Sequence, residues 1–330
     1  MGRHAALSEN ELAQGVHLDL LRNVFLQASQ SASLRERATR YRFVRRSVRR
    51  FLPGEKVEDA LAAARALADR GISSLLTHLG ENVTQRAEAE TVTAQYWDLL
   101  DRIHAAALPS EVSVKLTQLG LDLAPDFCFA NLSRLLTHPL HQGPSRRLLW
   151  IDMENSPYVD PTLEIYERAQ RVGAPVGVAV QAYLYRTQQD LERLIPLGGA
   201  IRLVKGAYRE PAEISYPLKK DVDDSYLHLG QRLLAAVAER ADFRAVLATH
   251  DVNLIRRLAA FGAQRGIEKQ RIEFAMLYGI QRDEQVRLAR EGFRSCVLVS
   301  YGDFWFPWFM RRLAERPANA FFVLRNIFSR

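Results

Sequence analysis

Charged and polar side chains close five of the short apolar runs in this chain. They are Lys115 in VSVKL, Asp152 in LLWID, Gln181 in VGVAVQ, Arg202 and Lys205 in IRLVKGAY, and Thr249 with His250 in AVLATHD. A single buried charge at a strand end is commonly a paired structural ion. Five such ends are harder to explain in that way, because each charge would need a partner in the same small space. We therefore favour a functional site over a purely structural network.

The charges of these residues indicate what such a site binds. Lys115, Arg202 and Lys205 are cationic, and Asp152 is acidic. Gly206 follows Lys205, and a glycine lets a ligand approach the backbone closely. The sequence therefore predicts an anionic substrate or cofactor.

Two adjacent arginines near the C-terminus, Arg311 and Arg312, extend this prediction. Each carries a planar guanidinium that can grip a carboxylate or a phosphate. Both can reach one ligand only if their helix lies across the mouth of the site. A solvated helix with an ion pair from Arg311 to Glu315 is the alternative.

No metal site is predicted, because ligand-type residues do not cluster along the chain. His250 and His78 each stand alone, without a second His or Cys at ligand spacing. The two cysteines, Cys128 and Cys296, are too few for a disulfide framework and indicate a reducing, cytoplasmic protein.

The elements that would position these residues are repeated strand and helix units. The apolar runs are Ile72 to Leu76, Val112 to Leu116, Leu148 to Asp152, Val176 to Gln181, Ala200 to Val204, Ala245 to Thr249, Ile272 to Ala275 and Cys296 to Ser300. Eight strands alternating with helices over about 250 residues are typical of an α/β protein of the (β/α)8 barrel type, whose site lies at the C-terminal strand ends. A doubly wound sheet is less favoured, since no GxGxxG turn follows a run.

The domain organisation follows from the change of pattern near residue 70. Residues 1–70 show helical spacing and are predicted to form a helical segment packed on the barrel, and residues 71–330 the barrel itself. The 330 residues contain 48% hydrophobic and 25% charged residues, which excludes a disordered chain. No stretch approaches the roughly 18 apolar residues of a membrane span.

A basic stretch from Arg35 to Arg50 gives part of the net charge of +7. It is compatible with binding to nucleic acid or to an anionic membrane. A solvated helix face is the interpretation we favour, and no nucleic-acid partner is predicted.

The ordered motifs resemble those of the proline dehydrogenases, FAD-dependent barrel enzymes that oxidise L-proline to 1-pyrroline-5-carboxylate. The matching segments are RRFLPGE, SVKLTQLG, LLWIDMENS, AVQAYLYR, RLVKGAYRE, LATHD, IEFAMLYG and WFMRRLAERPAN. The resemblance runs from about residue 49 to residue 320 and implies a final helix over the barrel mouth that carries the arginine pair.

The resemblance also implies roles for individual residues. Lys115, Arg311 and Arg312 would hold the substrate carboxylate, while Asp152 would pair with Lys115 and Arg202 would lie beside the reactive part of the flavin. Leu277, Leu298 and Trp308 would line the substrate. The residues implied around FAD are Met153, Gln181, Arg202, Lys205, Gly206, Ala207, Tyr208, Thr249 and His250.

Three positions depart from the family pattern where the substrate ring should lie. Leu298 and Trp308 each stand in place of a tyrosine, and Ala275 in place of a glutamine. The carboxylate grip is kept, whereas the wall around the ring becomes more apolar. L-proline is the leading substrate, and a modified or larger cyclic or secondary amino acid is the alternative.

The resemblance further implies a membrane quinone as electron acceptor, reached by a peripheral contact. Because the ring wall has changed, a barrel that binds ligand without catalysis is an alternative of another class. A nucleic-acid binder ranks below both, because it would leave the polar strand ends unexplained.

Overall fold

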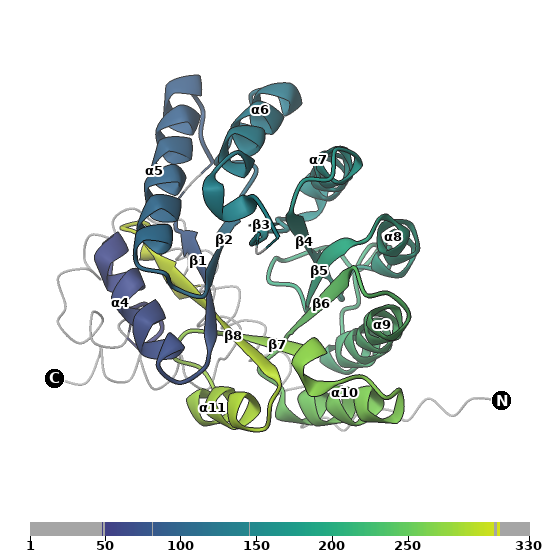
Figure 1. Ribbon diagram of the computed structural model, residues 1–330. Coiled ribbons are helices and arrows are strands. Elements are labelled where there is room, and N and C mark those ends of the chain that lie inside the picture. The colour runs from purple at the N-terminus through teal and green to yellow at the C-terminus, as the bar shows by residue number, and fades with distance from the viewer. Residues whose placement is uncertain (1–47, 49, 81, 145, 307–308, 311–330) are drawn as a thin grey trace, which may run out of the picture. The chain divides into compact units, whose positions relative to one another are not determined.

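A closed barrel of eight parallel strands forms the centre of the molecule (Figure 1). The computed structural model describes residues 48, 50–80, 82–144, 146–306 and 309–310. The strands are β1 Ser73–His78, β2 Ser110–Val114, β3 Leu149–Ile151, β4 Val176–Gln181, β5 Gly199–Val204, β6 Phe243–Ala248, β7 Glu273–Leu277 and β8 Arg294–Tyr301. Each pairs with the next in sequence, and β8 pairs with β1. The predicted (β/α)8 barrel is therefore confirmed, and each strand overlaps one predicted run.

Helices alternate with the strands and lie around the outside of the barrel (Figure 1). They are α4 Val57–Ala68, α5 Arg86–Ala105, α6 Pro125–Leu136, α7 Val159–Arg171, α8 Thr187–Leu194, α9 Lys219–Glu239, α10 Val252–Gln264 and α11 Arg282–Arg290. The amphipathic pattern of α7 shows why they pack there. Leu163, Tyr166 and Ala169, at three-residue spacing, are all buried.

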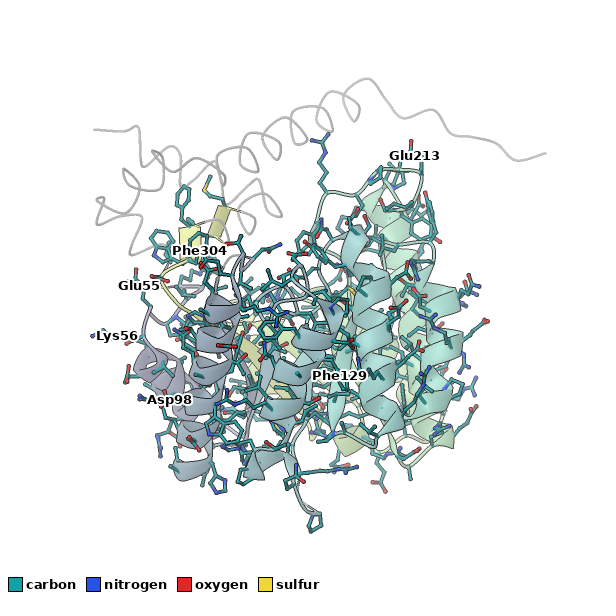
Figure 2. All side chains as sticks on the ribbon, turned by 90° about the horizontal axis from the view of Figure 1, so that it is seen from above. Glu55, Lys56, Asp98, Phe129, Glu213 and Phe304 are labelled. Atoms are coloured by element: carbon teal, nitrogen blue, oxygen red, sulfur yellow. The ribbon has the colours of Figure 1, made fainter. Side chains whose placement is uncertain are left out.

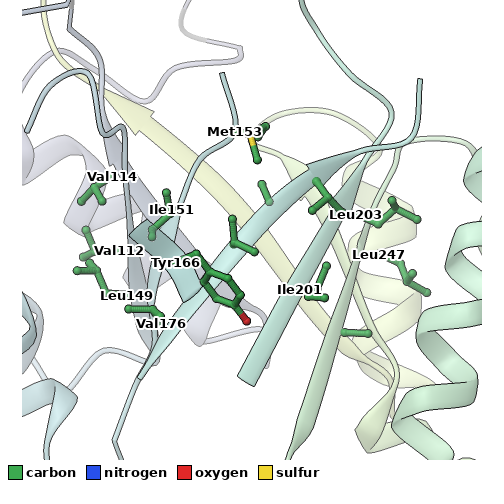
Figure 3. Close-up of a cluster of buried hydrophobic side chains, with 14 of the residues drawn as sticks. Val112, Val114, Leu149, Ile151, Met153, Tyr166, Val176, Ile201, Leu203 and Leu247 are labelled. Carbon is green, nitrogen blue, oxygen red and sulfur yellow. The ribbon is translucent and has the colours of Figure 1, made fainter. Parts of the chain in front are cut away.

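The main hydrophobic core lies between the strands and these helices. Val112, Ile151, Ile201 and Leu247 come from four strands and pack in one cluster with Tyr166 of α7 (Figure 3). Because side chains alternate along a strand, the intervening residues face the barrel interior. This alternation separates a predominantly apolar outer core from a partly polar interior.

A smaller cluster fills the barrel interior. It contains Leu75, Trp150, Ala200, Val246, Ala275 and Cys296, which come from six different strands. Gly177 of β4 makes room for the largest member, since a Cβ at this position would lie 2.5 Å from the Trp150 ring. Trp150 is thus fixed in the middle of the barrel.

The described residues fall into two compact units. One spans residues 52–302 and contains the barrel together with α4, which packs on β1 and β8. The other includes Phe51, Trp305 and Phe309. The ring centroid of Phe309 lies 6.4 Å from that of Phe51 and 6.4 Å from that of Trp305. The predicted helices of residues 1–47 and the predicted final helix over the mouth lie outside the described residues.

Candidate active site

A cluster of charged side chains lies where β2, β3 and β5 end. Lys115 and Asp152 directly follow β2 and β3, and the Lys115 Nζ lies 2.9 Å from Asp152 Oδ2. The Arg202 Nη2 of β5 donates to Asp152 Oδ1 and, at 3.2 Å, to the hydroxyl of Ser113. Since β2 and β5 are not neighbours in the sheet, these contacts cross the barrel interior. The pairing of Lys115 with Asp152 that the resemblance implied is present.

The electrostatics of this cluster keep its groups ionised. Burial alone would raise the pKa of Asp152, but the charges of Lys115 and Arg202 outweigh it and hold that pKa well below its usual range. Burial would likewise lower the pKa of Lys115, yet the Asp152 charge raises it. Two cations against one anion leave the cluster with an excess positive charge, which suits an anionic ligand.

Arg202 is buried but only partly satisfied. It is 5% exposed, and its Nε and Nη1 have no hydrogen-bond partner among the described residues. The guanidinium carbon lies 5.3 Å from the centre of the Trp150 ring. Unpaired donors in a buried guanidinium are costly, so this residue has capacity for a ligand.

A second charged layer lies toward the N-terminal end of the barrel. Arg244 donates from Nε and Nη2 to Glu273, at 2.8 and 2.9 Å, and from Nη1 to Glu111 at 2.7 Å. Glu111 also accepts from the indole nitrogen of Trp150 at 2.7 Å. Burial would raise the pKa of Glu111, but Arg244 outweighs this effect and lowers it. This layer is internally satisfied.

Lys205, expected near an anionic group, already has acidic partners. Its Nζ pairs with Asp223 of α9 and lies 3.5 Å from Asp251. Lys219, one turn before Asp223, pairs with the same carboxylate. Lys205 and Lys219 therefore share the Asp223 carboxylate, so the charge of Lys205 is partly balanced within the chain. The sequence did not reveal this pairing.

Gln181 at the end of β4 offers a second unsatisfied group. It is buried, its amide nitrogen donates to the Glu154 carbonyl at 3.1 Å, and its Oε1 has no partner within the described part of the chain. The Glu154 side chain instead accepts from Thr117, at 2.9 Å. Burial raises the pKa of Glu154 despite the nearby Lys115 charge.

The remaining residues predicted around FAD also lie at the C-terminal strand ends. Met153 follows Asp152, and Thr249 and His250 follow β6, where the His250 Nε2 accepts from the Leu277 backbone at 3.0 Å. Gly206 has a φ of +118°, and a Cβ there would lie 2.4 Å from the Tyr183 ring. The loop that carries Gly206, Ala207 and Tyr208 joins β5 to α9, and Figure 2 shows Glu213 of this loop at one end of the unit.

The ring-wall residues divide between described and undescribed positions. Ala275 is part of the interior cluster, and Leu298 packs against it from β8. Leu277 ends β7 and is the register partner of Leu298. Trp308, Arg311 and Arg312 lie outside the described residues, so their predicted roles are untested.

Two residues of the cluster, Ser113 and Trp150, were missed by sequence reasoning. The alternation of side chains along a strand could have identified both residues. Ser113 precedes Lys115 by two residues, and Trp150 precedes Asp152 by two. Residues at this spacing share one face of a strand. A small polar and a large aromatic side chain therefore had to accompany the two charges.

Two kinds of feature are absent from the described residues. They contain no helix that is long and apolar enough to cross a membrane. They also contain no group of three or more His, Cys, Asp or Glu side chains arranged to hold a metal ion.

Solved structures similar to this chain support the same fold. Proline utilization A (PutA) from Bdellovibrio bacteriovorus, in a form inactivated by N-propargylglycine, superposes with a TM-score of 0.75 at 22% identity. The match covers 82% of this chain and 33% of that one, so the chain spans about a third of the longer protein. PutA from Corynebacterium freiburgense matches with a TM-score of 0.68.

Sequence comparisons give the family. The family model described as proline dehydrogenase matches residues 60–325. Proline dehydrogenase 1 of Bacillus subtilis is 37% identical over 93% of this chain and 99% of its own length. Proline dehydrogenase of Deinococcus radiodurans is 38% identical over 84% of this chain and 89% of its own. The chain therefore belongs to the proline dehydrogenase family.

Proposed function

We propose that this protein oxidises L-proline to 1-pyrroline-5-carboxylate, with FAD as the acceptor of the hydride. The observation that carries the proposal is the cluster of Lys115, Asp152 and Arg202, in which one buried and one partly buried cation share one anion at the barrel mouth. A family member with this excess positive charge is suited to an amino-acid carboxylate beside a flavin.

The residues present fit a flavin on two observations. Arg202 retains two buried donor nitrogens and Gln181 a buried carbonyl oxygen, each without a partner among the described residues. Donors and an acceptor of this kind match the polar edge of a flavin ring, which presents both types of group. The residues that would hold FAD are Met153, Gln181, Arg202, Lys205, Gly206, Ala207, Tyr208, Thr249 and His250. When bound, the flavin supplies the two-electron redox chemistry.

The chain's own part in the reaction is placement and charge. Asp152 keeps Lys115 protonated, so that Lys115 together with Arg311 and Arg312 can hold the substrate carboxylate. Fixing the carboxylate orients the ring carbon next to nitrogen for transfer. The guanidinium of Arg202 provides a fixed positive charge in a buried place, where it stabilises negative charge that develops nearby.

The changed ring wall favours one alternative substrate class. Ala275 and Leu298 belong to the apolar interior cluster around Trp150, so they present no hydroxyl or amide to a ligand. A modified or different cyclic or secondary amino acid, larger or N-substituted, would gain from this surface. A barrel that binds ligand without turnover is the alternative of another class.

The experiment that tests these proposals starts from the visible spectrum of the purified protein. L-proline, hydroxyproline, and N-methylated or six-membered analogues are then added anaerobically in turn. Bleaching of a flavin band by proline supports the main proposal, and bleaching by an analogue alone supports the altered substrate. A flavin band that no compound bleaches, in a protein that still binds proline, supports the non-catalytic barrel.

The electron acceptor is proposed to be a quinone, reached from a cytoplasmic location by peripheral contact with the membrane. The basic stretch between Arg35 and Arg50 would make that contact through anionic lipid. Sedimentation with vesicles of anionic lipid tests this proposal. Binding should weaken as salt is added, and an absence of salt-sensitive binding would contradict it.

A further inference from the structure

The hydroxyl of Ser113 lies between the two opposite charges of the mouth. Ser113 is fully buried, and its Oγ donates to Asp152 Oδ1 at 2.6 Å while it accepts from Arg202 Nη2 at 3.2 Å. A hydroxyl has a single hydrogen to donate. Its donor capacity is therefore used by Asp152, and the hydrogen bonds of its hydroxyl among the described residues go to Asp152 and Arg202.

These contacts define the orientation of the Arg202 guanidinium. One nitrogen, Nη2, makes both of its contacts, to Asp152 and to Ser113, and the ring of Trp150 lies 5.3 Å from the guanidinium carbon. A planar group held at one corner by two acceptors and packed near an aromatic ring has little freedom to rotate. The Nε and Nη1 groups are consequently held in one orientation, with no partner among the described residues.

Without the hydroxyl, a competing arrangement becomes available. Arginine and carboxylate groups favour a bidentate pair with two parallel hydrogen bonds. An Arg202 that lacks Ser113 as an acceptor can turn about its bond to Asp152 toward this arrangement. That turn would commit a second guanidinium nitrogen to Asp152 and withdraw it from a ligand.

We propose that Ser113 is a positioning residue, whose hydroxyl holds Asp152 and Arg202 so that the unpaired Nε and Nη1 groups of Arg202 are directed to the flavin. The inference rests on the function proposed above and adds a residue that acts through Arg202. It predicts that Ser113 affects flavin binding and hydride transfer more than it affects folding or the grip on the substrate carboxylate, which Lys115 provides.

The same strand supplies a matched control. Ser110 begins β2, is 1% exposed, and shares a 2.7 Å hydrogen bond with the hydroxyl of Ser74. Ser110→Ala removes a buried hydroxyl from the same strand, but its partner is neutral. Any loss specific to Ser113→Ala therefore reports the charged cluster and not the loss of a hydroxyl from β2.

The test compares both variants with the wild type in three measurements. FAD affinity is measured by titrating the apoprotein, the limiting rate and half-saturating proline concentration by anaerobic stopped-flow, and stability by thermal unfolding. For Ser113→Ala we expect the limiting rate and the FAD affinity each to fall about tenfold, as for a lost hydrogen bond to a charged group. The half-saturating proline concentration should change less than about twofold, because Lys115 and its ion pair are retained.

Ser110→Ala should keep the rate and FAD affinity of the wild type. If Ser113→Ala matches Ser110→Ala in both quantities, the inference is overturned. If wild-type protein binds FAD but proline does not reduce it, only the proposed reaction fails, because FAD affinity still separates the two variants. A wild-type protein that binds no FAD would overturn both.

Discussion

Arg202 and Arg244 are two arginines of the barrel interior that approach the same tryptophan ring, at 5.3 and 5.4 Å from the centre of Trp150. Their register places them one layer apart, since Ala200 is the partner of Arg244 and Arg202 that of Val246. Arg244 uses three nitrogens on two carboxylates, whereas Arg202 uses one nitrogen and leaves two without described partners.

This difference distinguishes a structural charge from a functional one better than residue type does. The layer of Arg244, which we call the lower layer, borders a cavity of about 700 Å³ at the N-terminal end of the barrel. Every donor nitrogen of Arg244 nevertheless has a partner. The layer of Arg202, which we call the upper layer, has two cations against one carboxylate, and two nitrogens of Arg202 lack a partner among the described residues. A layer that served stability alone would have all of its buried donors paired. We therefore interpret the upper layer, whose donors are incompletely paired, as the one built for a ligand.

The largest effect is expected for Arg244→Met. The substitution leaves Glu111 and the buried Glu273 without their shared cation, and breaking such a pair costs about 3 to 5 kcal/mol in the free energy of unfolding. The rate of flavin reduction per bound flavin should stay within about threefold, because Arg202 and Arg244 share no hydrogen-bond partner among the described residues. Denaturant unfolding and stopped-flow measure the two quantities.

The control for this substitution is Arg240→Ala, which breaks the exposed pair with Asp242. A surface pair of this kind contributes about 0 to 1 kcal/mol. Equal destabilisation by the two variants would mean that the lower layer is not structural.

Arg202→Met should show the reverse behaviour. Asp152 keeps Lys115 and Ser113 as partners, so the free energy of unfolding should fall by less than in Arg244→Met. The rate of flavin reduction should fall about 100-fold, as when one preorganised donor is removed from an active site. A variant that is strongly destabilised but reduces its flavin at the wild-type rate would invert the comparison.

Trp150→Phe tests whether the ring serves both layers. The change removes the hydrogen bond to Glu111 and shrinks the surface near Arg202, so we expect a loss of about 1 to 2 kcal/mol in unfolding free energy. The flavin-reduction rate should fall about threefold, in line with a weakened cation–π contact. Trp97→Phe, on α5 outside the barrel, is the control and should leave that rate unchanged.

The fold was predictable to the extent that each strand contains an apolar run. A boundary shifted where a polar residue faces inward, because β2 includes Glu111, which precedes the predicted run Val112 to Leu116. The period of two places Ser113 on the same face as Lys115, so this neighbour could have been found. The bond of Arg244 to Glu111, 133 residues apart, could not, because it depends on closure of the barrel.

The pH dependence of Asp152→Asn gives the smallest effect and the most direct test of the ion pair. The Asp152 pKa is held well below its usual value near 3.8, so its contribution to stability is complete above that value and is lost as the pH falls toward the folded-state pKa. Between pH 5 and pH 3 the unfolded chain takes up the proton while the folded carboxylate does not. By linkage, the wild type should therefore lose about 1 kcal/mol more unfolding free energy than Asp152→Asn over this range. Lys115 stays charged throughout, because its raised pKa lies far above this window. Urea titrations of both proteins at several pH values measure the difference, and parallel curves would show that Asp152 is not held ionised by Lys115 and Arg202.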